Sequence, residues 1–228
     1  MGPRIAVTTY LAGTSLQGAA HFAWLSRDLE QSAKPPVPDD VMTQHSVYVI
    51  SAVLLAVAAL EGTINELFAD SVANPGGRAH PLPESSRNRL AEAVRLGALE
   101  RISVLDKFQM ALILTTGTPF ETGRQPHQDA HLLVPLRNAL VHYEPEPVVT
   151  VGWDKEVEAL AKKLGSKFLP NPLTGAGNPF FPNRCLGSGC AEWAAKTAIE
   201  FLEAFHSKIG LPSPHGDVSR WLAGPPKS

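Results

Sequence analysis

The chain has 228 residues, of which 44% are hydrophobic, and a formal net charge of −2, so it can bury one sizeable core. The slightly acidic charge disfavours a protein that coats nucleic acid non-specifically, because such proteins are usually basic. Two cysteines and no secretory leader pattern at the start are typical of a cytoplasmic protein with reduced thiols.

Helical patterns fill the first third of the chain. Residues 14–33 contain few β-formers and end at the breaker PPVPDD, residues 35–40, whose aspartates can cap a second helix. We expect that helix to run to about residue 73. It carries the longest apolar run, VYVISAVLLAVAAL at 47–60, which is too short to span a bilayer comfortably and is followed by Glu61. The run therefore predicts a buried core helix and no membrane span.

Helical periodicity returns after each of the later loops. Proline and glycine mark loops at 74–83 and at 166–187. VVTV at 148–151 is the one segment that could form a short strand. The remaining helices are predicted at 83–114 (in one piece or two), from about 127 to 143, at 153–165 and at 188–208.

These elements predict an all-α protein, a single helical-bundle domain of five to six helices. Residues 1–40 are expected to form an N-terminal helix and linker, and residues 41–208 the helical domain. Residues 209–228 are rich in proline and are expected to form a loose C-terminal tail.

The segment PLRNALVHYEPEP, residues 135–147, places Arg137, Asn138 and His142 in an otherwise apolar helical run. On a helix Asn138 and His142 share one stripe, and the long side chain of Arg137 can reach around to it. A histidine can transfer a proton near neutral pH, and a guanidinium can stabilise the charge of a phosphorane transition state. Asparagine can orient the imidazole or the phosphate. The set suits metal-independent cleavage of RNA, which supplies its own 2′-hydroxyl nucleophile.

The sequence RNALVH at 137–142 resembles the R-x4-6-H motif of the HEPN superfamily. These small all-α proteins include metal-independent ribonucleases of toxin–antitoxin, CRISPR and phage-defence systems. The resemblance implies an HEPN-like fold over roughly residues 41–208, with Arg137, Asn138 and His142 as catalytic residues and with no metal or cofactor. It also implies a homodimer whose motif helices face each other across an RNA-cleaving groove, and an antitoxin or regulatory protein as a further partner.

Three residues outside the motif bear on this resemblance. Glu61 and Asn65 lie one helical turn apart at the end of the apolar helix, and HEPN proteins often place a polar residue on an earlier helix next to the motif arginine. A buried glutamate there would hold Arg137 in place; the alternative is an exposed helix end. Tyr143 directly follows the motif. In HEPN toxins paired with nucleotidyltransferase antitoxins the modified tyrosine lies one residue further on, where this chain has Glu144, so the pattern for control by AMPylation is not met.

Three interpretations of the motif stay open: a ribonuclease, a non-catalytic HEPN-like module that binds a partner protein or nucleotide, and a plain helical protein in which Arg137 pairs with Glu61 for stability. The first two differ in whether the motif lines an open cleft at a two-fold interface or is buried by its own chain. His127 and His131 have the spacing of a metal pair but lack the glutamate of H-E-x-x-H, so we predict no metal site.

Overall fold

The computed structural model describes residues 8–73, 76–144 and 155–224, with side chains from residue 158 onward in the last range. Within these ranges the chain is helical and forms no strand, which confirms the predicted all-α class. The candidate strand at 148–151 lies outside the described residues. The elements are α1 (Ala12–Ser32), α2 (Asp39–Ala73), α3 (Glu84–Arg95), α4 (Val104–Thr116), α5 (His127–Val141), α6 (Lys155–Leu164), a short π-helical turn (Phe180–Arg184), α7 (Ser188–Ile209) and a 3-10 turn (Ser219–Ala223).

Residues 83–114, predicted as one helix or two, form two helices with a turn between them. α3 ends at Arg95, and Gly97 follows with a φ of 68°, a left-handed conformation that residues with a side chain rarely adopt. Ser103 then caps α4, because its hydroxyl accepts a hydrogen bond from the backbone N–H of Asp106 at 3.2 Å. The described part of the chain therefore contains seven α-helices where five to six were expected.

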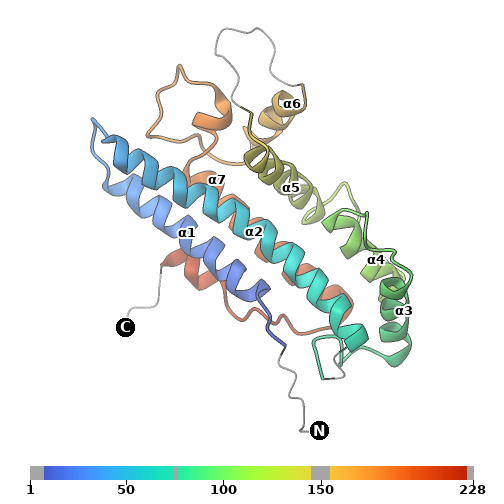
Figure 1. Cartoon of the computed structure of the whole chain (residues 1–228). Helices are drawn as coiled ribbons and strands as arrows, with labels where there is room; N and C mark the ends of the chain where they lie inside the picture. Colours follow the sequence, from blue (N-terminus) through green and yellow to red (C-terminus); the bar gives the residue numbers. More distant parts are fainter. Residues whose placement is uncertain (1–7, 74–75, 145–154, 225–228) are drawn as a thin grey trace, which may run out of the picture.

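The apolar helix α2 is the centre of the bundle and contacts α1, α3, α4, α5 and α7. In Figure 1 it lies between α1 and α5, with α7 behind it. Leu60 and Phe68 are among its fully buried side chains. A Cβ added at Gly62 would lie 3.1 Å from that of Ala12 on α1, so small residues allow these two helices to approach closely. A helix that is apolar on nearly every face is expected to lie at the centre of a bundle, and α2 does so.

Of the described helices, α2 is the one long and apolar enough to cross a membrane by length and composition. Half of its most apolar window is nevertheless buried against the rest of the protein. A core helix has the same composition, so this property is weak evidence for a membrane span.

The segments before and after the predicted domain pack on the bundle. α1 lies along α2 and also contacts α7. The tail after α7 was expected to be loose, but its described part turns back and packs on α1 through residues 219–223. Arg27 on α1 donates a hydrogen bond to the carbonyl of Leu222 at 2.7 Å, and His215 and Val218 are buried. The tail is ordered here because its apolar side chains, among them Trp221 and Leu222, pack against α1 and the core.

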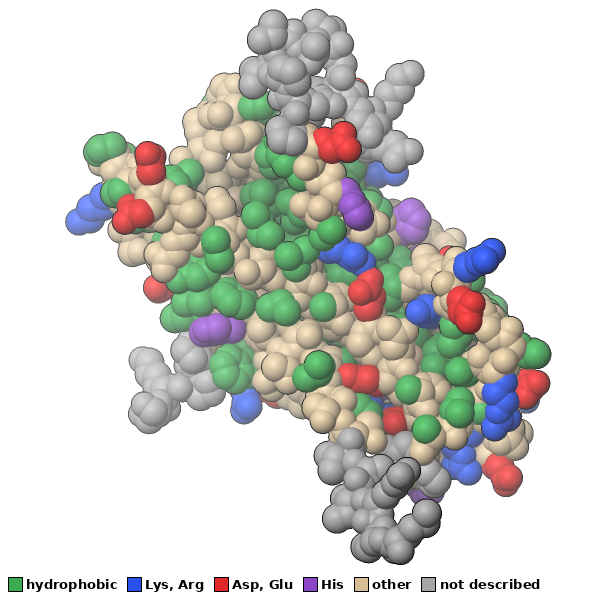
Figure 2. Space-filling model, viewed as in Figure 1, with side chains coloured by type: hydrophobic (Ala, Val, Ile, Leu, Met, Phe, Trp, Pro, Cys, Tyr) green, Lys and Arg blue, Asp and Glu red, His purple; other side chains and the backbone are tan. Residues whose placement is uncertain are grey.

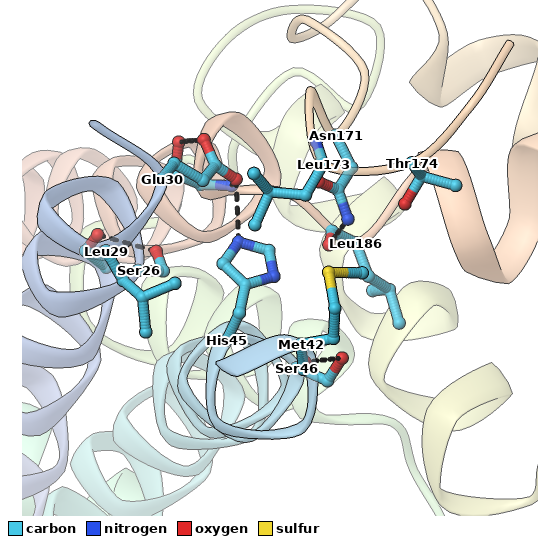
Figure 3. Close-up of polar contacts among 12 residues, drawn as sticks. Ser26, Leu29, Glu30, Met42, His45, Ser46, Asn171, Leu173, Thr174 and Leu186 are labelled. Atoms are coloured by element: carbon cyan, nitrogen blue, oxygen red, sulfur yellow. Dashed lines mark hydrogen bonds and ion pairs between the residues drawn. The ribbon is translucent and has the colours of Figure 1, made fainter. Parts of the chain in front are cut away.

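Two carboxylates from neighbouring helices cap helix N-termini. Glu66 of α2 accepts hydrogen bonds from the backbone N–H groups of Leu11 and Ala12, at 2.8 and 2.9 Å, where α1 begins. Glu30 of α1 accepts one from the backbone N–H of Ser188 at 2.7 Å, where α7 begins. The same carboxylate bonds the Nε2 of buried His45 at 2.7 Å (Figure 3). Each carboxylate meets free N–H groups and the positive end of a helix dipole, so both tie helices that are distant in sequence.

Candidate functional site

The motif lies in the second half of α5, which runs without a break through Pro135. Leu133 and Leu136 are fully buried and fix the inner face of the helix against the bundle. With that face fixed, Arg137 is partly buried at the edge of the helix and Asn138 is exposed. The sequence pattern therefore places the polar motif at the boundary between core and solvent.

His142 is the C-cap residue of α5, one position beyond the last helical residue, with φ −105° and ψ 31°. Its backbone N–H still bonds the carbonyl of Asn138 at 2.9 Å, so the two residues stay one turn apart, as predicted for a helix. The side chain of His142 is exposed. Tyr143 is 46% exposed, and its ring centroid lies 6.4 Å from that of Phe181. Glu144 is the last described residue of this segment.

The guanidinium of Arg137 forms an ion pair with the carboxylate of Glu61 on α2. The expected contact between Glu61 and the motif arginine is therefore present, although the glutamate is partly exposed and not buried. The side chain of Arg137 is 23% exposed and that of Glu61 is 44% exposed, so the pair is held by the protein and still reached by water. The Nε atom of Arg137 is buried and makes no hydrogen bond with the described residues.

Beside this pair is a cleft of about 410 Å³ between α2, the start of α4 and α5, which we call the motif cleft. On its far side Lys107 donates a hydrogen bond from Nζ to the Oδ1 atom of Asn65 at 3.0 Å. The cleft thus combines two cations, one carboxylate and two side-chain amides. Its polar lining residues are Glu61, Asn65, Ser103, Lys107, Arg137 and Asn138.

Four of the predicted site residues meet in this cleft and two do not. Glu61 and Asn65 of α2 come together with Arg137 and Asn138 of α5. His142 and Tyr143 are not among the lining residues and lie at the exposed end of α5. Within one chain, the histidine of the motif therefore does not line the motif cleft that the arginine lines.

Lys107 and Ser103 form the α4 side of the motif cleft, and no pattern in the sequence singles them out. Neither residue carries a motif, and a single lysine on a helix is typical of a solvated face. Only the packing of α4 against α2 brings Lys107 next to Asn65.

Only the first histidine of the pair at the start of α5 is packed in the core. His127 is buried, and burial together with the charge of His131 lowers its pKa below the ordinary value. His131 is exposed, although the two ring centroids are 6.3 Å apart. Among the residues that the structure describes, no group of three or more possible ligands could hold a metal ion.

The fold and the site define an all-α helical protein with an open cleft formed around an arginine–glutamate pair. No protein-family model, no curated protein and no solved structure matches the chain. The link to the HEPN superfamily therefore rests on the RNALVH motif and on the position of Glu61 beside Arg137.

Proposed function

We propose that the protein is a metal-independent endoribonuclease of the HEPN type that acts as a toxin or phage-defence effector. The observation that carries the proposal is the position of Arg137. Its guanidinium is held by Glu61 at the wall of an open cleft, next to the exposed Asn138. A cation that is fixed in place and open to solvent is suited to bind a phosphate and stabilise its transition state.

In the proposed reaction a base removes the proton of a ribose 2′-hydroxyl, and the oxygen attacks the adjacent phosphorus. The P–O5′ bond breaks, and an acid donates a proton to the leaving 5′-oxygen. The products are a 2′,3′-cyclic phosphate and a 5′-hydroxyl. His142 supplies the proton transfer, Arg137 stabilises the charge on the phosphorane, and Asn138 orients the phosphate or the imidazole.

The reaction calls for a second chain, because each motif offers one histidine for the two proton transfers. We propose a homodimer in which the ends of two α5 helices lie near the two-fold axis. Val141 is 52% exposed and Tyr143 is 46% exposed on either side of His142. Figure 2 shows patches of hydrophobic side chains over α1, α2 and α5, separated by tan surface and isolated charged side chains. An apolar contact beside His142 would bring both histidines to one groove.

The purely structural interpretation of the Arg137–Glu61 pair has less support. Both side chains are partly exposed, and ion pairs in such positions contribute only about 0–1 kcal/mol to stability. So small a contribution to stability does not explain why an arginine lies at this position. A binding role does explain it, because a ligand can reach a cation that is partly exposed.

A non-catalytic binding module is the second candidate, and one observation favours it. His142 does not line the motif cleft. The cleft of a single chain can therefore bind a nucleotide or a partner protein without a proton donor beside it. Cleavage and mere binding give different results in one assay.

The test is incubation of the purified protein with single-stranded RNA in excess chelator, followed by analysis of the fragment ends. The proposal expects fragments that end in a 2′,3′-cyclic phosphate and begin with a 5′-hydroxyl. Binding of intact RNA without cleavage supports the second candidate. Fragments that form only when a metal ion is added contradict the proposed mechanism.

A further inference from the structure

The α4 side of the motif cleft has a cation that the proposed reaction does not use. Lys107 is one turn beyond the N-cap Ser103 and partly buried. Its Nζ donates to the amide oxygen of Asn65 at 3.0 Å. Within the described residues no carboxylate forms an ion pair with Lys107, whereas Arg137 across the cleft pairs with Glu61.

This arrangement leaves a net positive charge on the α4 side of the cleft. Glu61 offsets the charge of Arg137, and the neutral Asn65 holds Lys107 without neutralising it. The nearest acid in sequence, Asp106, accepts a hydrogen bond from the hydroxyl of Ser103 at 2.7 Å and does not line the cleft. An anion that enters the cleft beside Arg137 therefore meets a second, positioned ammonium group.

The size and shape of the cleft limit which kind of molecule can carry that anionic group into it. Its volume of about 410 Å³ lies within the range of small-molecule sites, about 300–1,000 Å³. It is bounded by helices on both sides, so an A-form duplex, whose phosphates lie on a wide rigid surface, cannot enter it. A single strand can insert one nucleotide, and the amides of Asn65 and Asn138 offer both donors and acceptors to its base or ribose.

We propose that the motif cleft binds one nucleotide of single-stranded RNA and that Lys107 is the ligand of the phosphate next to the scissile one. This inference rests on the proposed function, because it takes RNA as the ligand of the cleft. Lys107 is a binding residue here and takes no part in proton transfer, and the helices that bound the cleft, rather than Lys107, exclude duplexes.

The test measures binding separately from cleavage. The probe is a fluorescein-labelled oligouridylate with 2′-O-methyl groups, which lacks the nucleophile, and its affinity is measured by anisotropy over a range of salt concentrations. Lys107→Gln should weaken binding several-fold and reduce the slope of log affinity against log salt by about 0.7, the value for one phosphate contact to a single strand. Lys107→Arg should restore most of both.

Lys34→Gln is the matched control, because it removes the same charge from an exposed lysine just before α2 begins. The start of α2 and Glu61 are separated by about 33 Å of helix at 1.5 Å per residue, so this variant should bind as the parent does. Melting temperatures of all variants should stay close to that of the parent, since neither lysine is in the core.

The outcomes separate this inference from the proposed function. A parent protein that cleaves RNA, with a Lys107→Gln variant unchanged in affinity, salt slope and KM, overturns the inference and leaves the ribonuclease standing. Affinity that depends on Lys107 without any cleavage supports the cleft as a nucleotide site and contradicts the ribonuclease. A parent protein that does not bind the probe overturns the inference directly.

Discussion

Arg137 on α5 and Glu61 on α2 form an ion pair between residues 76 positions apart in the sequence. Both side chains are partly exposed, at 23% and 44%. The carboxylate fixes the direction of the guanidinium, while its open side stays accessible from the motif cleft. A phosphate can therefore approach a cation whose side-chain entropy has already been reduced by the fold.

Replacing Arg137 separates a binding role from a structural one. Because the pair is partly exposed, Arg137→Ala should lower the free energy of unfolding by only about 1 kcal/mol or less. The same variant should lose cleavage by about 10²-fold or more, through loss of transition-state charge stabilisation. Urea unfolding and an RNA cleavage assay on one preparation measure both. Destabilisation by about 3–5 kcal/mol, as for a broken buried pair, would instead show that the arginine serves the fold.

Stability should fall in mild acid because of His215. Burial, and then the charges of His206 and Arg78, lower the pKa of His215 from 6.5 to about 4. The unfolded chain binds a proton near pH 6.5 and the folded chain only near pH 4, so between these values the unfolded state holds more protons. The contribution of His215 to the free energy of unfolding is complete above pH 6.5 and is lost as the pH falls towards 4. The loss amounts to about 3 kcal/mol at most.

The corresponding measurement is the free energy of unfolding across that pH window for the parent and for His215→Gln. The variant should show a shallower dependence on pH, whatever its absolute stability. His80→Gln, at an exposed histidine, serves as the control and should keep the slope of the parent. Equal slopes for the parent and His215→Gln would show that His215 is not held neutral by the fold.

Glu30 should behave as a cap shared by three helices. Burial alone raises its pKa, but hydrogen bonds from His45 and Ser188 outweigh burial and hold the pKa below the ordinary 4.5. Its stabilising effect is therefore present above pH 4.5 and is lost as the pH falls further. Glu30→Ala should lower the free energy of unfolding near neutral pH by about 2 kcal/mol or more, because it leaves buried donors without an acceptor.

Glu203→Ala is the control for this cap, since Glu203 is an exposed acid on the same helix as Ser188. It should change the free energy of unfolding by less than about 0.5 kcal/mol. Amide hydrogen exchange adds a local readout. In Glu30→Ala the first turn of α7 should lose protection before the rest of the helix does, and uniform loss along α7 would argue against a capping role.

Assembly can be tested at the apolar residue next to the motif histidine. If the ends of two α5 helices meet at a two-fold axis, Val141→Asp buries two carboxylates in the contact and should shift the dimer towards monomer. The fold should persist, because Val141 is 52% exposed. Light scattering with sedimentation measures the mass of parent and variant. A parent that is monomeric at micromolar concentration contradicts the proposed dimer.

Much of the fold could be predicted from sequence because its signals are local. The aspartates after PPVP mark the start of α2 at Asp39, and α5 begins at His127 as expected. The position of Glu61 beside Arg137 was one of two alternatives left open by the sequence, and it came from the resemblance to HEPN proteins, which often place a polar residue on an earlier helix next to the motif arginine.

Other features depend on contacts that leave no local pattern. Glu30 meets Ser188 across 158 positions of sequence, and Lys107 reaches Asn65 only because α4 packs on α2. The tail was predicted to be loose because it is rich in proline. The packing of the apolar residues around Trp221 against α1 depends on the tertiary fold and leaves no pattern in the sequence. In each case tertiary packing, rather than periodicity or capping signals, decides the position.

The rate at which His142→Ala cleaves single-stranded RNA in chelator, measured with the melting temperature of the same sample, tests the central claim most directly. His142 is exposed and caps the end of α5, so the variant should melt within a few degrees of the parent. Without its imidazole, proton transfer fails and the rate should fall by about 10²-fold or more. A well-folded His142→Ala protein that cleaves RNA as fast as the parent would contradict the ribonuclease mechanism.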